Sequence, residues 1–443
     1  MTIAGSDSGG GAGIEADLKT FSALGVFGTC VVTAITAQNT MGVQGIFPVP
    51  PEVVKAQIQA VLEDIPVKAA KTGMLYSRGI MEVVAEAAGK HGIPLVVDPV
   101  FTAGTGSSLI IEEDKAALVD LLLPKAKVFT PNLSEAEAVT GLKIDGLEDM
   151  KEAARRIADS GAEAVIIKGG HLEAADRKIY DVLYHNGSFR VFEKERVDIE
   201  PHGGGCAFSA AITAFLARGE DLERAVEGAE EFIKASFMGA TRVGSGRVPV
   251  NPLASLHKKS EAIEVLGRVE AAARMIEENI SFLPYIAEVG TQIAMALPFP
   301  TGPMDVAAIE GRIVKLRGGP RAVGPARLGA SRHIANVILT AIKHDSEIRA
   351  AMNLHYDPRL VEAFRRMGCE AAEFDRGSEP AEVKHVEGMS LSWGTEEAIR
   401  SAGRVPDIIY DKGEVGKEPM IRVLGRDAVE VVEKALKAIR SIS

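Results

Sequence analysis

The chain has 443 residues, 46% of them hydrophobic and 25% charged, which is the composition of an ordinary globular protein. Its formal net charge of −11 argues against general nucleic-acid binding, because that activity needs a basic surface. Its cysteines, Cys30, Cys206 and Cys369, lie far apart in the sequence, so neither a disulfide framework nor a zinc cluster is expected.

Residues 1–250 alternate short apolar runs with amphipathic segments. The chain begins with a strand-like segment and not with a basic and apolar leader, so we expect a cytoplasmic protein without membrane contact. Three runs predict buried strands, namely Val31–Ala37, Leu95–Val100 and Ala164–Ile167. Apolar residues recur at helical spacing in Val53–Leu62, Gly79–Ala88 and Leu147–Ala158. This alternation predicts an α/β/α fold, a doubly wound and mostly parallel sheet with helices on both faces.

The pattern changes twice further along the chain. Asn186-Gly187 separates two strand-like segments and predicts a β-hairpin. Residues 251–261 are predicted to form a linker, with Ser260 as the cap of a helix that runs to about Glu278. The segments beyond it predict a second, smaller α/β domain over residues 262–443. Its predicted elements are the strands Ile313–Leu316 and Ile408–Tyr410 and the helices Ser331–Lys343 and Arg426–Ile439.

Two glycine-rich segments each lead into a predicted helix. The first, Ala4–Asp17, would let a ligand approach the backbone and leave amides unpaired for it, although a mobile loop is an equal alternative. No GK[ST] follows it, which excludes a P-loop. The second, Pro201–Ala211, would offer amides and a helix dipole to a transferring phosphoryl group. Cys206 in its first helical turn would have a lowered pKa and could act as a base, although structural cysteines are commoner.

Polar residues follow two further strands. Asn132 and Glu135 come after the strand-like residues 128–130, where they could orient hydrated magnesium beside phosphates. The spacing alone favours a plain cap, with Asn132 capping the helix and Glu135 closing a capping box. Lys168, followed by Gly169, Gly170 and His171, suits a nucleotide phosphate, and a surface lysine in a tight turn is equally compatible.

These four segments, in this order at strand ends, resemble the ribokinase-like family. More narrowly, residues 1–245 resemble the hydroxymethylpyrimidine and phosphomethylpyrimidine kinases of thiamine synthesis. The resemblance rests on IAGSDSGGGAGIEADLKT at 3–20, TAITAQNT at 33–40, KTGML at 71–75, DPV at 98–100, TPNLSEAE at 130–137, IKGGH at 167–171 and HGGGC at 202–206. It implies substrate contacts from Gly5, Asp17, Gln38, Met74 and Val100, with Asp17 and Gln38 on the aminopyrimidine edge and Met74 against the ring.

The same resemblance implies the groups that handle the phosphates. Asp98 and Glu135 would place magnesium, and Cys206 would be the general base. The ATP contacts would come from Asn132, Lys168, Gly203 and Gly205.

The glycine loop departs from the family at two positions. Pro201 and Gly204 stand where the usual Thr-His-Gly-Thr-Gly-Cys motif has threonines, so two hydroxyls that could bond phosphate are missing. Pro201 also lacks an amide hydrogen. We therefore expect slower kinase turnover, or an altered nucleotide contact, compared with a threonine-bearing loop.

Three features of residues 262–443 suit an anionic ligand. Arg312 begins a strand, and Ser331 starts a helix that carries Arg332 and His333 in its first turn. Amides, helix dipole and guanidinium would converge there on a diphosphate. The third feature is the Asp-Lys-Gly turn that contains Lys412. A satisfied or exposed histidine is the commoner alternative for His333.

This half resembles the thiamine-phosphate synthase domain that is fused to the pyrimidine kinase, mainly in archaea, on GASRHIAN at 329–336 and PDIIYDKG at 406–413. The implied reaction joins hydroxymethylpyrimidine diphosphate to a thiazole phosphate and releases pyrophosphate. Arg312 and His333 would stabilise the diphosphate, and magnesium is expected. Secondary anion contacts would come from Arg332, Asn336 and Lys412.

Three alternatives stay open at this point. The second domain could be a non-catalytic sensor of thiamine phosphate, with Arg312 and His333 as ligand contacts only. The first could phosphorylate a related ring alcohol such as pyridoxal, although Gln38 with Met74 favours the aminopyrimidine. A DNA-binding regulator is disfavoured by the acidic charge and by the absence of a helix-turn-helix motif ahead of the second domain. We expect a homo-oligomer whose partners are otherwise small molecules.

Overall fold

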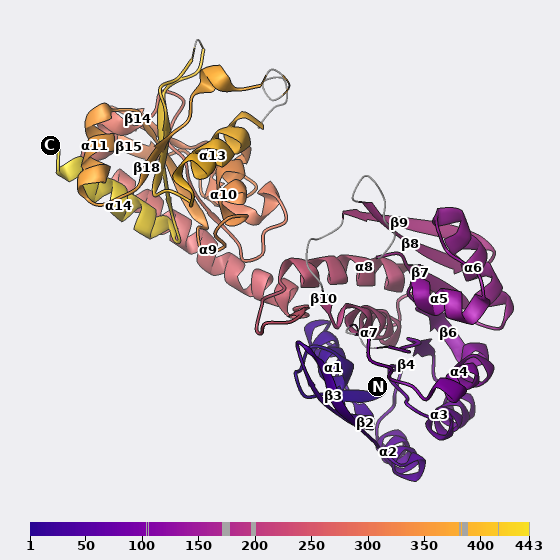
Figure 1. The fold of residues 1–443 in the computed structure, drawn as a ribbon. Coiled ribbons are helices and arrows are strands. Elements are labelled where there is room, and N and C mark those ends of the chain that lie inside the picture. Colours follow the sequence, from indigo (N-terminus) through magenta and orange to yellow (C-terminus); the bar gives the residue numbers. More distant parts are fainter. Residues whose placement is uncertain are drawn as a thin grey trace. The chain divides into compact units, whose positions relative to one another are not determined.

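The computed structural model describes residues 1–102, 104, 106–170, 178–195, 201–380, 382, 389–414 and 416–442. The chain divides into two compact units, Met1–Leu256 and His257–Ser443, which are described separately (Figure 1). Among the helices of the described residues, none combines the length and the apolarity needed to cross a membrane.

The first unit is built on one sheet. Its strands in the described residues are β1 (Thr2–Asp7), β2 (Cys30–Asn39), β3 (Gly42–Pro48), β4 (Ala70–Thr72), β5 (Leu95–Val97), β6 (Ala126–Phe129), β7 (Ala164–Lys168), β8 (Lys178–His185) and β9 (Ser188–Glu195). They lie in the order β3-β2-β1-β4-β5-β6-β7-β8-β9. The strands from β2 to β7 in this order are parallel, and β3, β8 and β9 are antiparallel to their neighbours. The sequence-based expectation of a mostly parallel, doubly wound sheet is confirmed.

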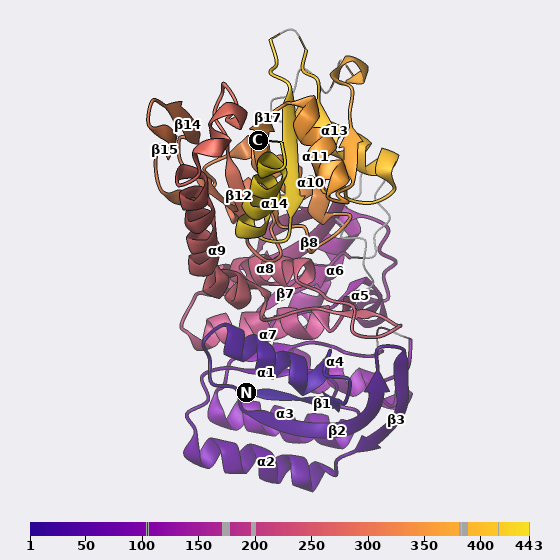
Figure 2. The same ribbon diagram turned by 90° about the vertical axis from the view of Figure 1, so that its left-hand side faces the viewer.

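Helices cover both faces of this sheet (Figure 2). They are α1 (Gly13–Ala23), α2 (Pro51–Asp64), α3 (Arg78–His91), α4 (Lys115–Leu122), α5 (Leu133–Thr140), α6 (Leu147–Asp159), α7 (Gly204–Ala217) and α8 (Leu222–Met238). Successive side chains of β5 point to opposite faces of the sheet, and each face has its own apolar core. Leu95 and Val97 pack with α2, α3, α4 and α6, whereas Val96 packs with α7 and α8. Two short strands, β10 (Pro201–His202) and β11 (Val248–Pro249), pair in parallel. β10 lies directly before α7, and β11 lies after α8.

The predicted hairpin is present between β8 and β9. His185 pairs with Ser188 across the turn, and Asn186 and Gly187 have φ angles of 50° and 74°. Positive φ at both central residues is the type I′ geometry that the Asn-Gly pair favours.

A group of buried charges joins this hairpin to α8. The Nζ atom of Lys194 lies 2.6 Å from Oδ2 of Asp181 and also pairs with Glu230. Burial, with the Asp181 carboxylate adding to it and Lys194 opposing it, raises the pKa of Glu230 to about 8. Asp181 in turn accepts a 2.9 Å hydrogen bond from the amide of Gly169, so the group is tied to the residue that directly follows Lys168.

The second unit has a mostly antiparallel sheet, a feature that the sequence pattern did not predict. Its strands in the described residues are β12 (Ile293–Ala296), β13 (Val306–Ile309), β16 (Ala326–Leu328), β17 (Ala350–His355), β18 (Ala371–Glu373), β19 (Ile408–Asp411) and β20 (Met420–Gly425). They lie in the order β16-β13-β12-β17-β20-β19-β18, and only β18 and β19 are parallel. A separate two-stranded ribbon pairs β14 (Ile313–Leu316) with β15 (Gly319–Ala322).

This sheet also lies between helices, which are α9 (Ala254–Glu277), α10 (Arg332–Ile342), α11 (Pro358–Arg366), α13 (Met389–Ala402) and α14 (Ala428–Arg440). Ile293 and Met295 of β12 pack with α9, α11 and α14, whereas Ala294 and Ala296 pack with α10 and α13. The period of two along the strand therefore sorts the side chains into two cores.

The start of α9 corrects one expectation. The helix begins at Ala254, inside the stretch predicted as a linker, and Ser260 lies within it, where its hydroxyl donates to the carbonyl of His257. The chain turns into the helix at Asn251, whose side-chain oxygen accepts a 3.0 Å hydrogen bond from the amide of Leu253. An Asx turn thus starts the helix earlier than the serine pattern indicates.

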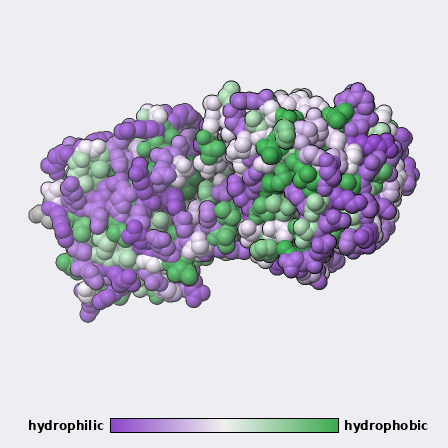
Figure 3. Space-filling model, turned by 90° about the horizontal axis from the view of Figure 1, so that it is seen from below, coloured by the Kyte–Doolittle hydropathy of each residue, from purple (hydrophilic) through white to green (hydrophobic). Residues whose placement is uncertain are grey.

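Hydrophilic residues cover most of the face seen in Figure 3, with apolar patches between them. Two apolar side chains of the first unit are exposed as a cross-strand pair: Ile35 of β2 is 55% exposed, and its partner Phe47 of β3 is 68% exposed.

The Glu230 group predicts a pH dependence of stability. The folded state keeps the carboxyl proton up to a pKa of about 8, whereas the ordinary value is 4.5, so the folded state loses stability relative to the unfolded one as pH rises between these values. Glu230→Gln removes this effect, and the variant should gain in melting temperature over the native chain as pH increases from 5 to about 8. Glu231→Gln, an exposed neighbour, is the control. If the melting temperatures of the native chain and of Glu230→Gln change with pH in the same way, the prediction is wrong.

Candidate functional sites

The carboxyl ends of the parallel strands gather polar residues at one edge of the first sheet. β1 ends at Asp7 and β7 ends at Lys168. Gln38 lies next to the end of β2, while Asp98 and Thr130 directly follow β5 and β6. Parallel strands present these ends on the same side, where open α/β sheets bind ligands.

The carboxylate of Asp7 organises the first glycine loop. It accepts hydrogen bonds of 2.8, 3.0 and 2.8 Å from the amides of Gly9, Gly11 and Ala12. Burial works to raise the pKa of Asp7, but the hydrogen bond with His202 and those from Gly9 and Ala12 outweigh it and lower the pKa. The expectation that these amides are left unpaired for a ligand is therefore wrong, because Asp7 uses them to fix the loop.

The two glycine loops interlock through His202. Its Nε2 atom lies 2.9 Å from Oδ2 of Asp7 and 3.2 Å from Nε2 of Gln38. Gly203 has a φ of 79°, and a Cβ atom there would lie only 1.8 Å from the carbonyl oxygen of Gly11. A Cβ atom on Gly11 would lie 2.4 Å from Cδ2 of His202. A side chain at position 203 therefore cannot fit without separating the loops, and one at position 11 would displace the His202 ring.

Three residues predicted to hold the pyrimidine lie together. Met74 is buried and packs in the same apolar cluster as the partly buried Val100. A Cβ atom on Gly5 would lie 3.0 Å from Sδ of Met74, so the glycine lets the backbone approach this side chain. Gln38 extends from β2, and its side chain contacts His202.

Asp17 does not lie where the resemblance implies. Its side chain is 0% exposed, and its carboxylate accepts a 2.6 Å hydrogen bond from Thr2 and pairs with Lys71 at 3.0 Å. Burial raises the pKa of Asp17, with Lys71 opposing the effect. The carboxylate is thus satisfied inside the protein, and the structure does not present it to an aminopyrimidine.

Asp98 is the centre of the phosphate side of the site. Its Oδ1 atom accepts hydrogen bonds from Nζ of Lys168 and from Oγ1 of Thr130, both at 3.0 Å, and Oγ of Ser209 lies 3.3 Å from Oδ2. Burial works to raise the pKa of Asp98, but Lys168 and then Lys71 outweigh it and lower the pKa. The structure therefore brings the predicted Asp98 and Lys168 into direct contact.

Asn132 and Glu135 form the predicted capping box. The side chain of Asn132 accepts from the amide of Glu135 at 2.9 Å, and the carboxylate of Glu135 accepts from the amide of Asn132 at 2.7 Å. Burial raises the pKa of Glu135 to about 7, with Lys168 opposing and Asp98 adding to the effect. The cap interpretation is confirmed, and the magnesium role remains a prediction.

The expected lowering of the pKa of Cys206 is wrong. Burial raises the pKa of this thiol to about 11, with Lys71 opposing and Asp17 and Asp98 adding to the effect. The cysteine does lie in the first turn of α7, but burial disfavours its thiolate there.

The start of α7 offers an anion site beside Lys168. Gly203 is its N-cap, and no side chain of the described residues caps the helix. A Cβ atom on Gly205 would lie 3.3 Å from Nζ of Lys168 and 3.8 Å from Oδ2 of Asp98. The first-turn amides therefore lie next to the lysine. His171, the last residue of the Lys168 motif, lies outside the described residues.

The two departures from the family motif are accommodated by packing. Pro201 pairs with Val248 in the short parallel ribbon. A Cβ atom on Gly204 would lie 3.1 Å from Cζ of Phe237, so a threonine at this position requires the ring to move. The slower turnover expected from these residues remains a prediction.

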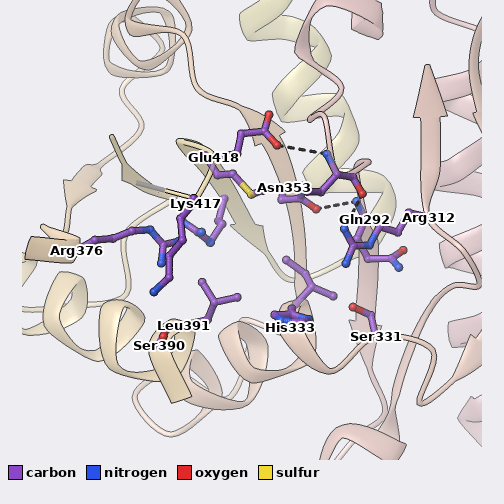
Figure 4. A pocket seen from close by; sticks show the side chains of 15 residues that line it. Gln292, Arg312, Ser331, His333, Asn353, Arg376, Ser390, Leu391, Lys417 and Glu418 are labelled. Carbon is purple, nitrogen blue, oxygen red and sulfur yellow. Dashed lines mark hydrogen bonds between the residues drawn. The ribbon is translucent and has the colours of Figure 1, made fainter. Parts of the chain in front are cut away.

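The second unit contains a pocket of about 320 Å³, drawn in Figure 4. Arg312 and His333, the predicted catalytic pair, both line it, together with Ser331. Its other lining residues are Val289, Gln292, Ile334, Asn353, Arg376, Ser390, Leu391, Gly416, Lys417, Glu418, Met420 and Arg422.

Arg312 lies in a sharp turn. Its φ is 70°, unusual for a residue with a side chain, and the preceding Gly311 has a φ of 72°. Nη1 of Arg312 donates a 2.6 Å hydrogen bond to the carbonyl of Val289. A strained backbone persists only where the surrounding structure maintains it, and such residues cluster at functional sites.

The three predicted secondary anion contacts are not among the residues that line the pocket. Arg332 is exposed, Asn336 is partly buried, and Lys412 pairs with Glu373 at 2.8 Å. Successive helical residues point about 100° apart, so His333 and Arg332 face different directions. Lys412 directly follows the buried strand end at Asp411, but its own side chain is 62% exposed.

Amide side chains that the sequence did not single out build one wall of the pocket. Gln292 donates to the carbonyl of Ile309 at 2.8 Å and accepts from its amide at 2.9 Å, as a neighbouring strand would. Asn353 accepts from the amide of Gln292 at 2.7 Å. Glu418 accepts from the amide of Glu288 and from His355, both at 2.9 Å. Buried polar atoms are thereby satisfied and hold the wall in place.

Comparison with known proteins identifies both units. The family model of phosphomethylpyrimidine kinase matches residues 7–251, and that of thiamine-phosphate synthase ThiN matches residues 268–437. The chain is 37% identical, over 98% of its length and 96% of the relative, to the bifunctional thiamine biosynthesis protein ThiDN of Methanocaldococcus jannaschii. It is 44% identical to the hydroxymethylpyrimidine/phosphomethylpyrimidine kinase of Bacillus subtilis, over 57% of this chain and 94% of the relative.

Solved structures confirm the ribokinase-like fold of the first unit. An ADP complex of Bacillus subtilis pyridoxal kinase has a TM-score of 0.53 and 38% identity, and it covers 58% of this chain and 97% of its own. Staphylococcus aureus pyridoxal kinase with AMP-PCP and pyridoxal has a TM-score of 0.53 and 37% identity, over 57% of this chain and 92% of its own. Together with the full-length relative, these matches show that the chain belongs to the family of bifunctional thiamine biosynthesis proteins, in which a hydroxymethylpyrimidine/phosphomethylpyrimidine kinase is joined to a thiamine-phosphate synthase.

Proposed function

We propose that residues 1–250 transfer phosphoryl groups from ATP, with magnesium, to hydroxymethylpyrimidine and then to its phosphate. Residues 262–443 condense the resulting diphosphate with a thiazole phosphate to give thiamine phosphate and pyrophosphate, and residues 251–261 join the two domains. The observation that carries the kinase assignment is the contact of Lys168 with Asp98 beside the start of α7. For the synthase it is the pocket that holds Arg312 and His333.

The nucleotide binds at the start of α7. Lys168 contacts its phosphates, and the amides of Gly203 and Gly205 hydrogen-bond the transferring group, where the helix dipole favours negative charge. Asn132 lies next to Lys168 through a parallel bridge between the two backbones. This proximity supports a contact of Asn132 with the same phosphates.

Two buried carboxylates fit the magnesium ion that such a transfer uses. Magnesium is commonly held by one or two carboxylates together with phosphate oxygens and water. Asp98 and Glu135 are 2% and 6% exposed and influence each other's charge. They would hold the ion, which neutralises charge on the phosphates. No three His, Cys, Asp or Glu side chains of the described residues converge as a metal site, so phosphate oxygens and water would supply the remaining ligands.

The pyrimidine lies between Gly5, Met74 and Val100. Gln38 reads its amino edge, since a carboxamide offers a donor and an acceptor side by side. Asp17 acts indirectly, because its pairing with Lys71 keeps that cation near Cys206 and Asp98. Cys206 takes the proton of the substrate hydroxyl as the new P–O bond forms.

In the second unit, Arg312 and His333 stabilise the diphosphate as it leaves the pyrimidine. The electron-rich aminopyrimidine supports the cation that departure creates, and the thiazole nitrogen captures it. The protein supplies charge neutralisation, a shielded pocket and close placement of the two rings.

We further propose that the chain self-associates. Ile35 and Phe47 form an exposed apolar pair on the outer strands of the first sheet. Such a pair loses contact with water when it packs against a second copy.

The proposed reactions predict one product from four reagents. Purified protein with ATP, magnesium, hydroxymethylpyrimidine and thiazole phosphate should give thiamine phosphate, which mass spectrometry detects. Accumulation of pyrimidine diphosphate without condensation would reduce the second domain to a binding or sensing role. If no phosphorylated pyrimidine forms, the kinase assignment is wrong.

The role of Cys206 predicts a pH profile for the kinase. A base whose pKa is about 11 is mostly protonated at neutral pH, so its reactive fraction rises as pH increases. The kcat/KM for hydroxymethylpyrimidine should therefore rise about tenfold per pH unit between about pH 7 and 10. Cys206→Ser should be slow and lack this slope. A flat profile in the native enzyme would exclude Cys206 as the base.

The turn at Arg312 allows a clean test of its side chain. Asn tolerates the left-handed conformation, so Arg312→Asn should preserve the backbone while it removes the guanidinium. We expect a loss of at least about a hundredfold in synthase kcat, with the kinase rate unchanged. Arg321→Asn, whose side chain is 61% exposed, is the control. Synthase rates that remain equal in Arg312→Asn and the control would remove Arg312 from the mechanism.

A further inference from the structure

The pocket of the second unit has cationic side chains at two places. Figure 4 shows Arg312 and Ser331 on one side and Arg376 with Lys417 on the other, with Leu391 between them. The first place holds the residues already assigned to the diphosphate. The second has no role in the reaction described above.

Arg376 and Arg422 share a single carboxylate. Nε and Nη2 of Arg376 donate to Asp411 at 2.7 and 3.2 Å, and Nη1 of Arg422 donates to it at 2.8 Å. The three side chains are 7%, 3% and 0% exposed. Two guanidinium groups are thus buried against one negative charge. Burial lowers the pKa of Arg422, with Asp411 opposing the effect.

Lys417 has a carboxylate partner of its own. Its Nζ atom lies 3.4 Å from Oε2 of Glu379, so these two charges compensate each other. The nearby Glu418 is engaged by His355 and by backbone amides. The two buried guanidinium groups therefore share Asp411, whereas Lys417 is paired with Glu379.

The two guanidinium groups are held in fixed positions. The Cζ atoms of Arg376 and Arg422 each lie 5.4 Å from the centre of the Phe374 ring, which packs edge-on against Trp393. A guanidinium has five N–H donors, and these arginines use two and one of them on Asp411. Donors thus remain for a further acceptor in the pocket that both arginines line.

We propose that Arg376, Lys417 and Arg422 form a second anion subsite, which binds the phosphate monoester of the thiazole substrate. This inference rests on the proposed synthase reaction. Phosphate oxygens suit the planar fork of arginine, and two pocket-lining guanidinium groups that share one carboxylate offer further N–H donors to an anion. The diphosphate belongs at the other end, because His333 is the histidine among the described lining residues and can assist the departure of pyrophosphate.

Lys417 and Lys412 give a matched pair of variants in the full-length protein. Lys417 lines the pocket and its side chain is 38% exposed, and glutamine in its place still offers an N–H donor to Glu379. Lys412 is only five positions away, is 62% exposed and does not line the pocket. Synthase assays then vary three substrates separately: the pyrimidine diphosphate, the thiazole phosphate and the thiazole alcohol without phosphate.

Lys417→Gln should raise the KM for thiazole phosphate roughly tenfold, as expected for loss of a charge-assisted hydrogen bond. The KM for the pyrimidine diphosphate and for the thiazole alcohol should stay unchanged, and Lys412→Gln should match the native enzyme throughout. Arg376→Lys, which keeps the charge but loses the fork, should also weaken thiazole phosphate selectively.

Equal increases of KM for both phosphorylated substrates, or no increase, would overturn the subsite. If the native protein forms no thiamine phosphate, the proposed synthase reaction fails, and calorimetry with thiazole phosphate alone still decides the subsite. Weaker binding by Lys417→Gln than by Lys412→Gln supports it. Equal binding, or none to the native protein, overturns it.

Discussion

Asp98 and Asp411 are buried carboxylates, and each lies at the centre of the polar site of its own unit. An isolated buried charge costs several kcal/mol or more, so such a group must be surrounded by cations or hydrogen-bond donors. Lys168, Thr130 and Ser209 surround Asp98 in this way. The need to satisfy one carboxylate therefore fixes the position of a cation that would otherwise be a flexible side chain.

The same burial decides how protons are held in the kinase site. Desolvation raises the pKa of Cys206 to about 11 and that of Glu135 to about 7, while Asp98 beside Lys168 is kept ionised. A thiolate with so high a pKa is a strong base but a rare species at neutral pH. Phosphoryl transfer depends mainly on positioning and charge neutralisation, so a small reactive fraction is compatible with turnover.

Much of the fold follows from local sequence patterns. The Asn186-Gly187 hairpin and the capping box at Asn132 depend on neighbouring residues, and both are found as predicted. The three predicted strands also exist, but β5 ends at Val97 and Ile35 of β2 is exposed. The start of α9 was misplaced because Asn251 and Ser260 are both plausible starts, and tertiary packing selects between them. The antiparallel order of the second sheet depends on long-range pairing that periodicity does not encode.

The candidate sites show a similar division. A strand-end motif indicates Lys168 and a helix start indicates His333, because these positions follow from the element that carries them. Asp98 is expected only from the family resemblance. The burial of Asp17 against Lys71 and the grouping of Arg376 with Arg422 depend on side chains that are distant in sequence. The signs of the pKa shifts depend on the same three-dimensional surroundings, which a motif does not report.

The interlocked glycine loops have a dynamic consequence. Gly203 fits against the carbonyl of Gly11 without room for a methyl group, and His202 joins Asp7 to Gln38 across the same contact. Because these contacts join the two loops directly, a displacement of one loop disturbs the packing of the other. We therefore expect any movement of the proposed pyrimidine side to be coupled to movement of the proposed phosphate side.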